Sequence, residues 1–256
     1  MIISFRDLTL LFLIMARIGG LFAFAPVYSS RNIPAGLKSV LVFWIAITIL
    51  YVIPPSYAIP QGALSLITAL ILEVCIGALL GLLCYFTFIA IQAAGEIIDL
   101  QMGLSVATMF DPLFGATVSI IGRLSFYFGL IMFLILNGHH YILQGLVKSF
   151  EIMPVGSPIH LSPLTLGIVL DIGTNFWVMV VKLAAPAVML IFLSDFAFGI
   201  VSRVAPQVNV FMLGFQVKPA LGLVAILFSL SLLTKHIGGI IGTMYGDMIR
   251  ITQSIK

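Results

Sequence analysis

The amino-acid sequence predicts an all-helical membrane protein, and three observations support that fold class. Of the 256 residues, 61% are hydrophobic and only 8% are charged. The mean hydropathy is +1.23, and the apolar residues gather in long segments. An ordinary soluble domain carries roughly 25% charged residues, and this chain has too few polar side chains to cover a water-soluble fold. The composition therefore excludes a soluble enzyme, a nucleic-acid-binding domain and a disordered tail.

The apolar segments differ in length, which favours a packed assembly of helices over a row of simple spans. A membrane-crossing helix takes roughly 20 residues, so the second apolar segment, residues 39–53, is too short to cross a membrane comfortably. The third apolar segment, residues 63–95, is long enough for roughly 50 Å of helix at 1.5 Å per residue. We expect the stretch 137–163, which is rich in proline, to be an exposed polar connection. The six segments are 8–28, 39–53, 63–95, 113–136, 172–194 and 220–246.

Five charged residues lie inside these apolar segments. Each would cost about 2.5–3.5 kcal/mol at the centre of a lipid-facing helix, so we expect them to face protein or water. The strongest candidates for pairing across helices or subunits are Arg17, Glu73 and Arg123, which have apolar residues on both sides. The five residues are Arg17, Glu73, Arg123, Lys182 and Lys235.

Glycines four residues apart indicate close helix packing. Gly77 and Gly81 form one such pair, and Gly238, Gly242 and Gly246 form a second series. Small residues at this spacing let two helix backbones approach each other. We therefore expect crowded neighbours at both places.

A polar stretch follows the long third segment. Glu96, Asp99 and Gln101 arrive in quick succession, and Gly103 is expected to end the helix. An Asp-Pro pair further on disfavours helical geometry, so residues 104–115 are predicted to be a non-helical loop between two apolar helices. Irregular backbone at membrane depth is tolerated only where it is buried in protein or lines a cavity. An ordinary turn at the membrane surface is the alternative.

A second polar stretch runs from Asp195 to Lys218. It contains Arg203 and the two amides Gln207 and Asn209. A buried amide without a partner costs about 1–3 kcal/mol, so both are expected to bond to backbone or to a neighbouring subunit. A satisfied hairpin turn within this chain is the alternative.

The sequence offers no support for catalysis. His139 and His140 are adjacent, so on a helix they point about 100° apart and form no two-ligand face. No GxSxG, P-loop or GxGxxG motif is present, and the charges are scattered singly. We therefore expect no enzyme activity, no cofactor, no metal and no nucleic-acid partner.

Three passages together resemble one protein family. They are AGEIIDLQMG at 94–103 with Phe-Asp-Pro at 110–112, Pro-Gln-x-Asn-x-Phe at 206–211, and Ala-Arg-Ile-Gly-Gly at 16–20 leading to Ala25-Pro26. This pattern resembles the FliR family of the flagellar type III export gate, and the similarity covers nearly the whole chain. The injectisome homologue of the same apparatus is the near alternative.

The resemblance implies an architecture and a role. Members of that family join FliP and FliQ in the core gate through which unfolded flagellar proteins are exported, one copy closing the helical ring. The chain would then be a FliP-like part, residues 1–175, fused to a FliQ-like helical hairpin, residues 176–256. Implied partners are FliP, FliQ, FlhB, FlhA, membrane lipid and the exported chains, at the flagellar basal body in the bacterial inner membrane.

The resemblance also implies roles for particular residues. The loop 104–115 would plug the channel, because a flexible apolar constriction excludes water and still yields to a peptide. Gln207, Asn209 and Lys218 would contact a partner near the entrance. The plug residues are Leu104, Ser105, Val106, Ala107, Thr108, Met109, Phe110, Asp111 and Pro112. The buried or inter-subunit polar residues are Arg17, Glu73, Glu96, Asp99, Gln101, Arg123, Lys182, Asp195 and Arg203.

A secondary transporter is the main alternative of a different class. Charges inside apolar segments and a helix interrupted at Pro186 suit a transporter. Such a fold is expected to show two related halves, and residues 1–128 and 129–256 show no convincing repeat. A membrane enzyme ranks third, because the sequence offers no nucleophile or metal site.

Overall fold

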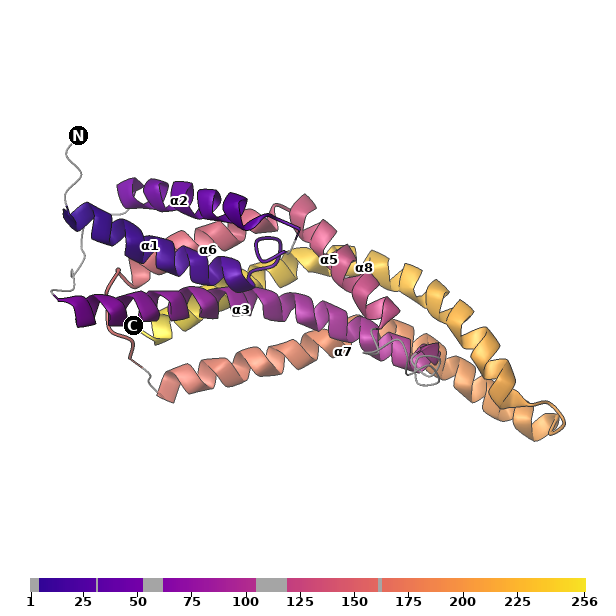
Figure 1. Ribbon diagram of the computed structural model, residues 1–256. Coiled ribbons are helices and arrows are strands. Elements are labelled where there is room, and N and C mark those ends of the chain that lie inside the picture. The colour runs from indigo at the N-terminus through magenta and orange to yellow at the C-terminus, as the bar shows by residue number, and fades with distance from the viewer. Residues whose placement is uncertain (1–4, 31, 53–61, 105–118, 161–162) are drawn as a thin grey trace. The chain divides into compact units, whose positions relative to one another are not determined.

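The computed structural model describes residues 5–30, 32–52, 62–104, 119–160 and 163–256, and every regular element in these ranges is an α-helix (Figure 1). The predicted all-helical class is therefore confirmed for this part of the chain. The helices are α1 (Phe5–Phe24), α2 (Ala35–Val52), α3 (Ala63–Met102), α5 (Ile120–Ile135), α6 (Gly138–Ile152), α7 (Pro163–Val204) and α8 (Val210–Ser254).

Most of these helices are suited to a membrane. Five described helices are long and apolar enough to cross one, namely α1, α2, α3, α7 and the first part of α8. The pair α5 and α6, bent by 73° at the break between them, adds a sixth candidate if both form one span. The described part of the chain is thus helical, and several of its helices have the length and apolar composition of membrane spans, as the overall composition predicts.

The prediction of an exposed polar connection at residues 137–163 is wrong. Fifteen of these residues form α6, which begins after Asn137 in a left-handed conformation. Its buried positions include Ile142, Leu146 and Phe150, which recur every four residues and form one apolar face. The polar residues between them lowered the average hydropathy and hid this pattern.

The chain divides into two compact units, and the three long helices α3, α7 and α8 contribute to both. The first unit comprises Met1–Thr87, Phe133–Gly173 and Ile240–Lys256. The second unit comprises Phe88–Met132 and Thr174–Gly239.

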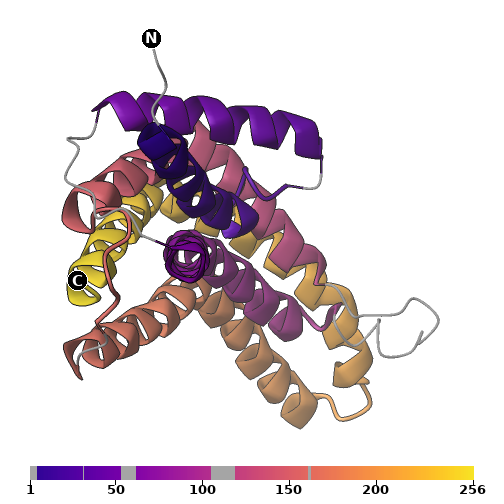
Figure 2. The ribbon, with the colours of Figure 1, turned by 60° about the vertical axis from the view of Figure 1, so that its left-hand side comes forward.

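In the first unit, glycines bring α1 and α3 into backbone contact. A Cβ added at Gly77 would overlap the Arg17 carbonyl oxygen, and one at Gly81 would lie 2.6 Å from the Leu21 carbonyl oxygen. A Cβ added at Gly20 of α1 would likewise overlap the Val74 carbonyl oxygen of α3. Figure 2, which looks nearly along the first part of α3, shows α1 beside it. The predicted crowding at Gly77 and Gly81 is confirmed.

The second glycine series behaves differently. Around Gly238, Gly242 and Gly246 no atom lies within 4 Å of an added Cβ. The predicted crowding is therefore not found there among the described residues.

The second unit also relies on small residues. A Cβ at Gly95 of α3 would lie 2.8 Å from the Cα atom of Gly122 in α5. Met102, at the end of α3, fills the space in front of Gly222 of α8. Pro186 lies inside α7, and the helix continues on both sides of it.

Candidate functional site

A buried ion pair joins α1 to α3 in the first unit. Arg17 Nε donates a hydrogen bond of 2.6 Å to Glu73 Oε2. The two residues are 0% and 1% exposed. Two charges taken out of water are tolerated only when each is paired and hydrogen-bonded, so the surrounding contacts are as important as the pair.

The α6 helix and the turn after it supply those contacts. Arg17 Nη1 donates to Ser149 Oγ at 3.3 Å and to the Met153 carbonyl oxygen at 3.1 Å. The Arg17 guanidinium carbon also lies 4.2 Å from the centre of the Phe150 ring, a cation–π contact. Glu73 Oε1 accepts the backbone N–H of Gly156 at 3.0 Å.

This cluster ties three separate helices together at one point. Arg17 comes from α1, Glu73 from α3, and the remaining partners from α6 and residues 153–156. Arg17 Nη2 finds no hydrogen-bond partner among the described residues. The arrangement fits an anchoring role, since a planar guanidinium holds several acceptors in fixed directions.

Sequence reasoning singled out Arg17 and Glu73 but missed their other partners. Ser149 and Met153 lie 132 and 136 residues from Arg17 along the chain. Neither residue stands out in the sequence, because a serine on an amphipathic helix and a methionine after it are common. The apolar face of α6, at Ile142, Leu146 and Phe150, is the signal in the sequence that could have placed this segment in the interior.

The end of α3 carries a second buried charge, in the second unit. Asp99 is 3% exposed, and its Oδ1 finds no hydrogen-bond partner in the part of the chain that the structure describes. Glu96, three residues earlier, is exposed and accepts a hydrogen bond from Gln92 Nε2 at 2.8 Å. Gln101 is also exposed. The two acids therefore have different environments in spite of their helical spacing.

The expected helix break after α3 is present. Gly103 has a φ of +78°, a left-handed conformation that glycine adopts without steric cost. Leu104 is half-buried. The other predicted plug residues, from Ser105 to Pro112, and the loop to residue 115 lie outside the described residues.

Two of the three predicted partner-contact residues, Gln207 and Asn209, lie in the turn between α7 and α8, and the third, Lys218, lies within α8. Asn209 Oδ1 accepts the Met212 backbone N–H at 3.2 Å and so caps the start of α8. Gln207 is exposed in the turn. Lys218 Nζ lies 2.6 Å from Asp195 Oδ1, linking the two helices of this hairpin.

The remaining predicted polar residues lie on the surface of the chain. Arg123, Lys182 and Arg203 are all exposed. No described group of three or more His, Cys, Asp or Glu side chains has the arrangement of a metal site.

Comparison with known proteins decides the family. The family described as Bacterial export proteins, family 1, matches residues 8–244. The chain belongs to this family.

The names of several similar proteins refer to flagellar biosynthesis or to secretion. This chain is 32% identical over 225 residues to the flagellar biosynthetic protein FliR of Bacillus subtilis, and the match covers 86% of each chain. It is 31% identical over 222 residues to the protein of the same name from Escherichia coli, covering 84% of this chain and 82% of that one. The secretion system apparatus protein SsaT of Salmonella typhimurium is 28% identical over 164 residues, 64% of this chain and 63% of its own.

Proposed function

We propose that this export protein is a core subunit of the flagellar type III export gate in the bacterial inner membrane, where it closes a ring of FliP and FliQ subunits. The observation that carries this proposal is the similarity to proteins named flagellar biosynthetic protein FliR over more than four-fifths of both chains. The membrane-crossing character of the helices agrees with that place in the cell.

The exposed surface of the α7–α8 hairpin supports assembly with other subunits. Many large apolar side chains on it are open to the surroundings, and extensive exposed apolar surface marks a protein or membrane interface. The exposed residues include Phe192, Phe196, Ile200, Phe211, Met212, Leu223, Leu227 and Phe228. We infer that residues 176–256 are the FliQ-like part and that residues 1–175 are the FliP-like part.

Asp99 is proposed to meet a partner subunit or the loop beyond Gly103. A buried carboxylate oxygen without a partner is costly, and an ionisable group inside an apolar helix is generally functional. Gln207 and Asn209, at the exposed turn, and Lys218, within α8, are proposed to face FlhB at the cytoplasmic entrance.

The loop 104–115 is proposed to seal the channel. The support is its sequence of small and apolar residues and its place directly after the helix-ending Gly103. A Met or Phe at a narrow point fills space and can still be displaced. Met109 and Phe110 are the bulky residues of the loop.

The assembly proposal is tested by deleting the gene in its host and restoring it from a plasmid with an affinity tag. We expect the deletion strain to lose motility and to stop secreting flagellar hook and filament proteins. The tagged chain should retain FliP and FliQ through purification in mild detergent. A motile deletion strain, or a tagged chain that purifies as a stable monomer, would overturn the proposal.

The seal is tested separately by deleting residues 106–110. This variant should co-purify with its partners at the wild-type level, because the described helix contacts lie elsewhere. Liposomes that contain the variant complex should conduct small ions at a higher rate than those with the intact complex. Equal conductance of the two fully assembled complexes would show that the loop is not the seal.

An injectisome gate is the second candidate, favoured by the similarity to a Salmonella secretion system apparatus protein. The same deletion strain distinguishes the two. If motility persists while secretion of virulence-type substrates stops, the chain serves the injectisome.

A further inference from the structure

In the second unit, α8 lies against the two residues at which the chain leaves α3. Met102, the last residue of α3, is 1% exposed. A Cβ added at Gly222 of α8 would overlap Met102 Cγ and Sδ and would lie 2.6 Å from its Cε atom. A Cβ added at Gly103 would lie 3.4 Å from Cε1 of Phe215, also on α8. Two consecutive residues at the end of α3 are therefore in contact with the same helix.

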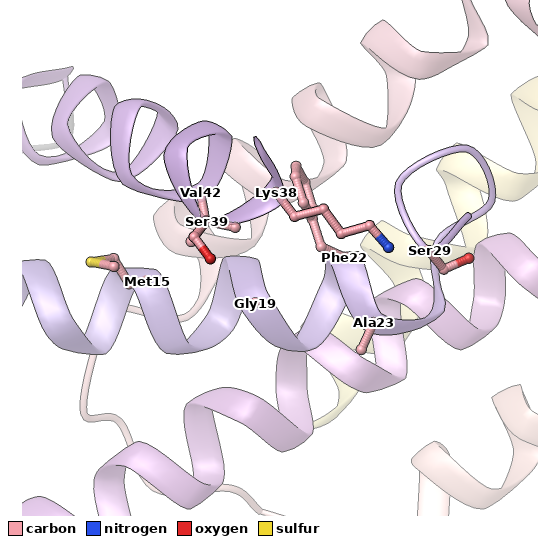
Figure 3. A pocket seen from close by; sticks show the side chains of 8 residues that line it. All are labelled: Met15, Gly19, Phe22, Ala23, Ser29, Lys38, Ser39 and Val42. Atoms are coloured by element: carbon pink, nitrogen blue, oxygen red, sulfur yellow. The ribbon is translucent and has the colours of Figure 1, made fainter. Parts of the chain in front are cut away.

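Gly222 has a specific reason to be a glycine. Glycine destabilises a helix interior relative to alanine, and not every helix glycine in this chain has a side chain packed against it. Gly19 of α1 borders an open groove between α1 and α2 (Figure 3), and no atom lies within 4 Å of a Cβ added there. At Gly222, in contrast, the missing side chain makes room for Met102, so the two residues form a matched pair.

The face of α8 that meets α3 is itself held in place. Phe215 and Gly222 are two helical turns apart and lie on one face of α8. Lys218, between them, forms the 2.6 Å ion pair with Asp195 of α7. Phe211, one turn before Phe215, packs its ring edge-to-face against it, with ring centroids 4.8 Å apart. The α7–α8 hairpin thus presents a supported surface to the end of α3.

These contacts restrict a residue that is otherwise free to rotate. Gly103 has a φ of +78°, and glycine has no Cβ to limit its backbone angles. Its N–H donates to the Leu100 carbonyl oxygen at 3.1 Å, which closes the last turn of α3. The backbone angles at Gly103 decide the direction of everything that follows, beginning with the half-buried Leu104. The ring of Phe215 beside Gly103 and the buried Met102 side chain before it narrow that choice.

We propose that Met102, Phe215 and Gly222 are positioning residues that fix the direction in which the chain leaves α3. They thereby hold the loop 104–115 where it seals the channel, so this inference rests on the proposed sealing function. A functional segment needs supporting residues whose own side chains are locked by packing, and a buried methionine in front of a glycine meets that condition. The three residues act through the backbone at Gly103 and touch no exported chain.

A spin label at position 104 measures the direction of this exit. The label is introduced through an unnatural amino acid in the full-length chain, which is purified with its associated subunits, and electron paramagnetic resonance reads its mobility. Gly222→Ala should raise the mobility, because the added Cβ displaces the Met102 side chain. Phe215→Ala should raise it by removing the ring beside Gly103. Phe215 is 36% exposed, so this second variant should fold.

Matched controls come from the same unit. No atom lies within 4 Å of a Cβ added at Gly238, and Phe228 is 69% exposed, so Gly238→Ala and Phe228→Ala on α8 should leave the label unchanged. A second label at the exposed position 124 of α5 reports general loosening and should keep its mobility in every variant. Met102→Ala removes the atoms that a new Cβ at Gly222 would overlap, so Gly222→Ala should add little further mobility in that background.

The ion conductance of liposomes with the unlabelled complex connects this position to the seal. Gly222→Ala and Phe215→Ala should co-purify with their partners at the wild-type level. Their conductance should rise about ten-fold, the population change that a packing contact of ordinary strength produces. The deletion of residues 106–110 is the reference. If that deletion does not raise the conductance, the sealing function is wrong, whereas the label at position 104 still decides whether α8 fixes the end of α3.

Three results would overturn the proposal. The first is unchanged mobility at position 104 in both Gly222→Ala and Phe215→Ala while circular dichroism shows intact helices. The second is an equal rise in mobility at positions 104 and 124, which would mean general loosening of the unit. The third is a mobile label at position 104 with unchanged conductance in both variants, while the 106–110 deletion leaks.

Discussion

Neutralising Glu73 is the sharpest test of the structure. Glu73→Gln keeps the shape of the side chain and removes its charge. Arg17, which is fully buried, then keeps its hydrogen bonds to Ser149 and Met153 but loses its counter-charge at 2.6 Å. Removing one partner of a buried ion pair costs about 3–5 kcal/mol, and we expect a loss of stability of that order.

The measurement is the free energy of unfolding by denaturing detergent, together with the amount of chain in the membrane. Glu151→Gln is the matched control, because Glu151 pairs with Lys148 at the same 2.6 Å with both side chains about half exposed. Water screens the attraction between exposed side chains, so such pairs contribute little to stability, and this control should be nearly neutral. If the two glutamine variants lose the same small amount of stability, the Arg17–Glu73 pair does not anchor these helices.

A double substitution separates the effect of charge pairing from the effect of the hydrogen bonds to α6. Arg17→Met combined with Glu73→Met leaves neither charge unpaired, and replacement of a buried pair by apolar residues is often close to neutral. The double variant should therefore be more stable than Glu73→Gln. A double variant that is less stable than Glu73→Gln would show that hydrogen bonds to α6, and not charge pairing, dominate the cluster.

Three further outcomes are expected. Gly77→Ala should destabilise the chain by about 1–3 kcal/mol, because its Cβ meets the backbone of α1, while Gly246→Ala, with open space around it, should be neutral or stabilising in the same unfolding assay. Asn209→Ala should lose the cap of α8 and about 1 kcal/mol, whereas Gln207→Ala should leave stability unchanged; equal losses in both would refute the cap. Asp99→Asn should leave the helix content of the purified chain unchanged by circular dichroism but lower the yield of the gate complex, and a normal yield would remove Asp99 from the interface.

Much of the fold follows from patterns that are local in the sequence. The apolar composition predicts membrane helices, and their positions agree with α1, α2, α3 and α5. The break at Gly103 follows from the freedom of glycine to adopt positive φ. The prediction of a polar connection at 137–163 is wrong because polar residues separate the buried positions of α6, and average hydropathy conceals an apolar face of this kind.

Local patterns along the chain are enough to predict the helical class, the membrane character, the helix-ending Gly103 and the presence of costly charges inside apolar segments. The packing of the helices is needed to show that Arg17 pairs with Glu73 and reaches α6, and that Asp99 is buried while Glu96 is exposed. The reason is physical: composition and periodicity describe single helices, whereas pairing depends on which helix faces meet across 56 or 132 residues of chain. That choice is made by the packing of α1, α3 and α6 as a whole.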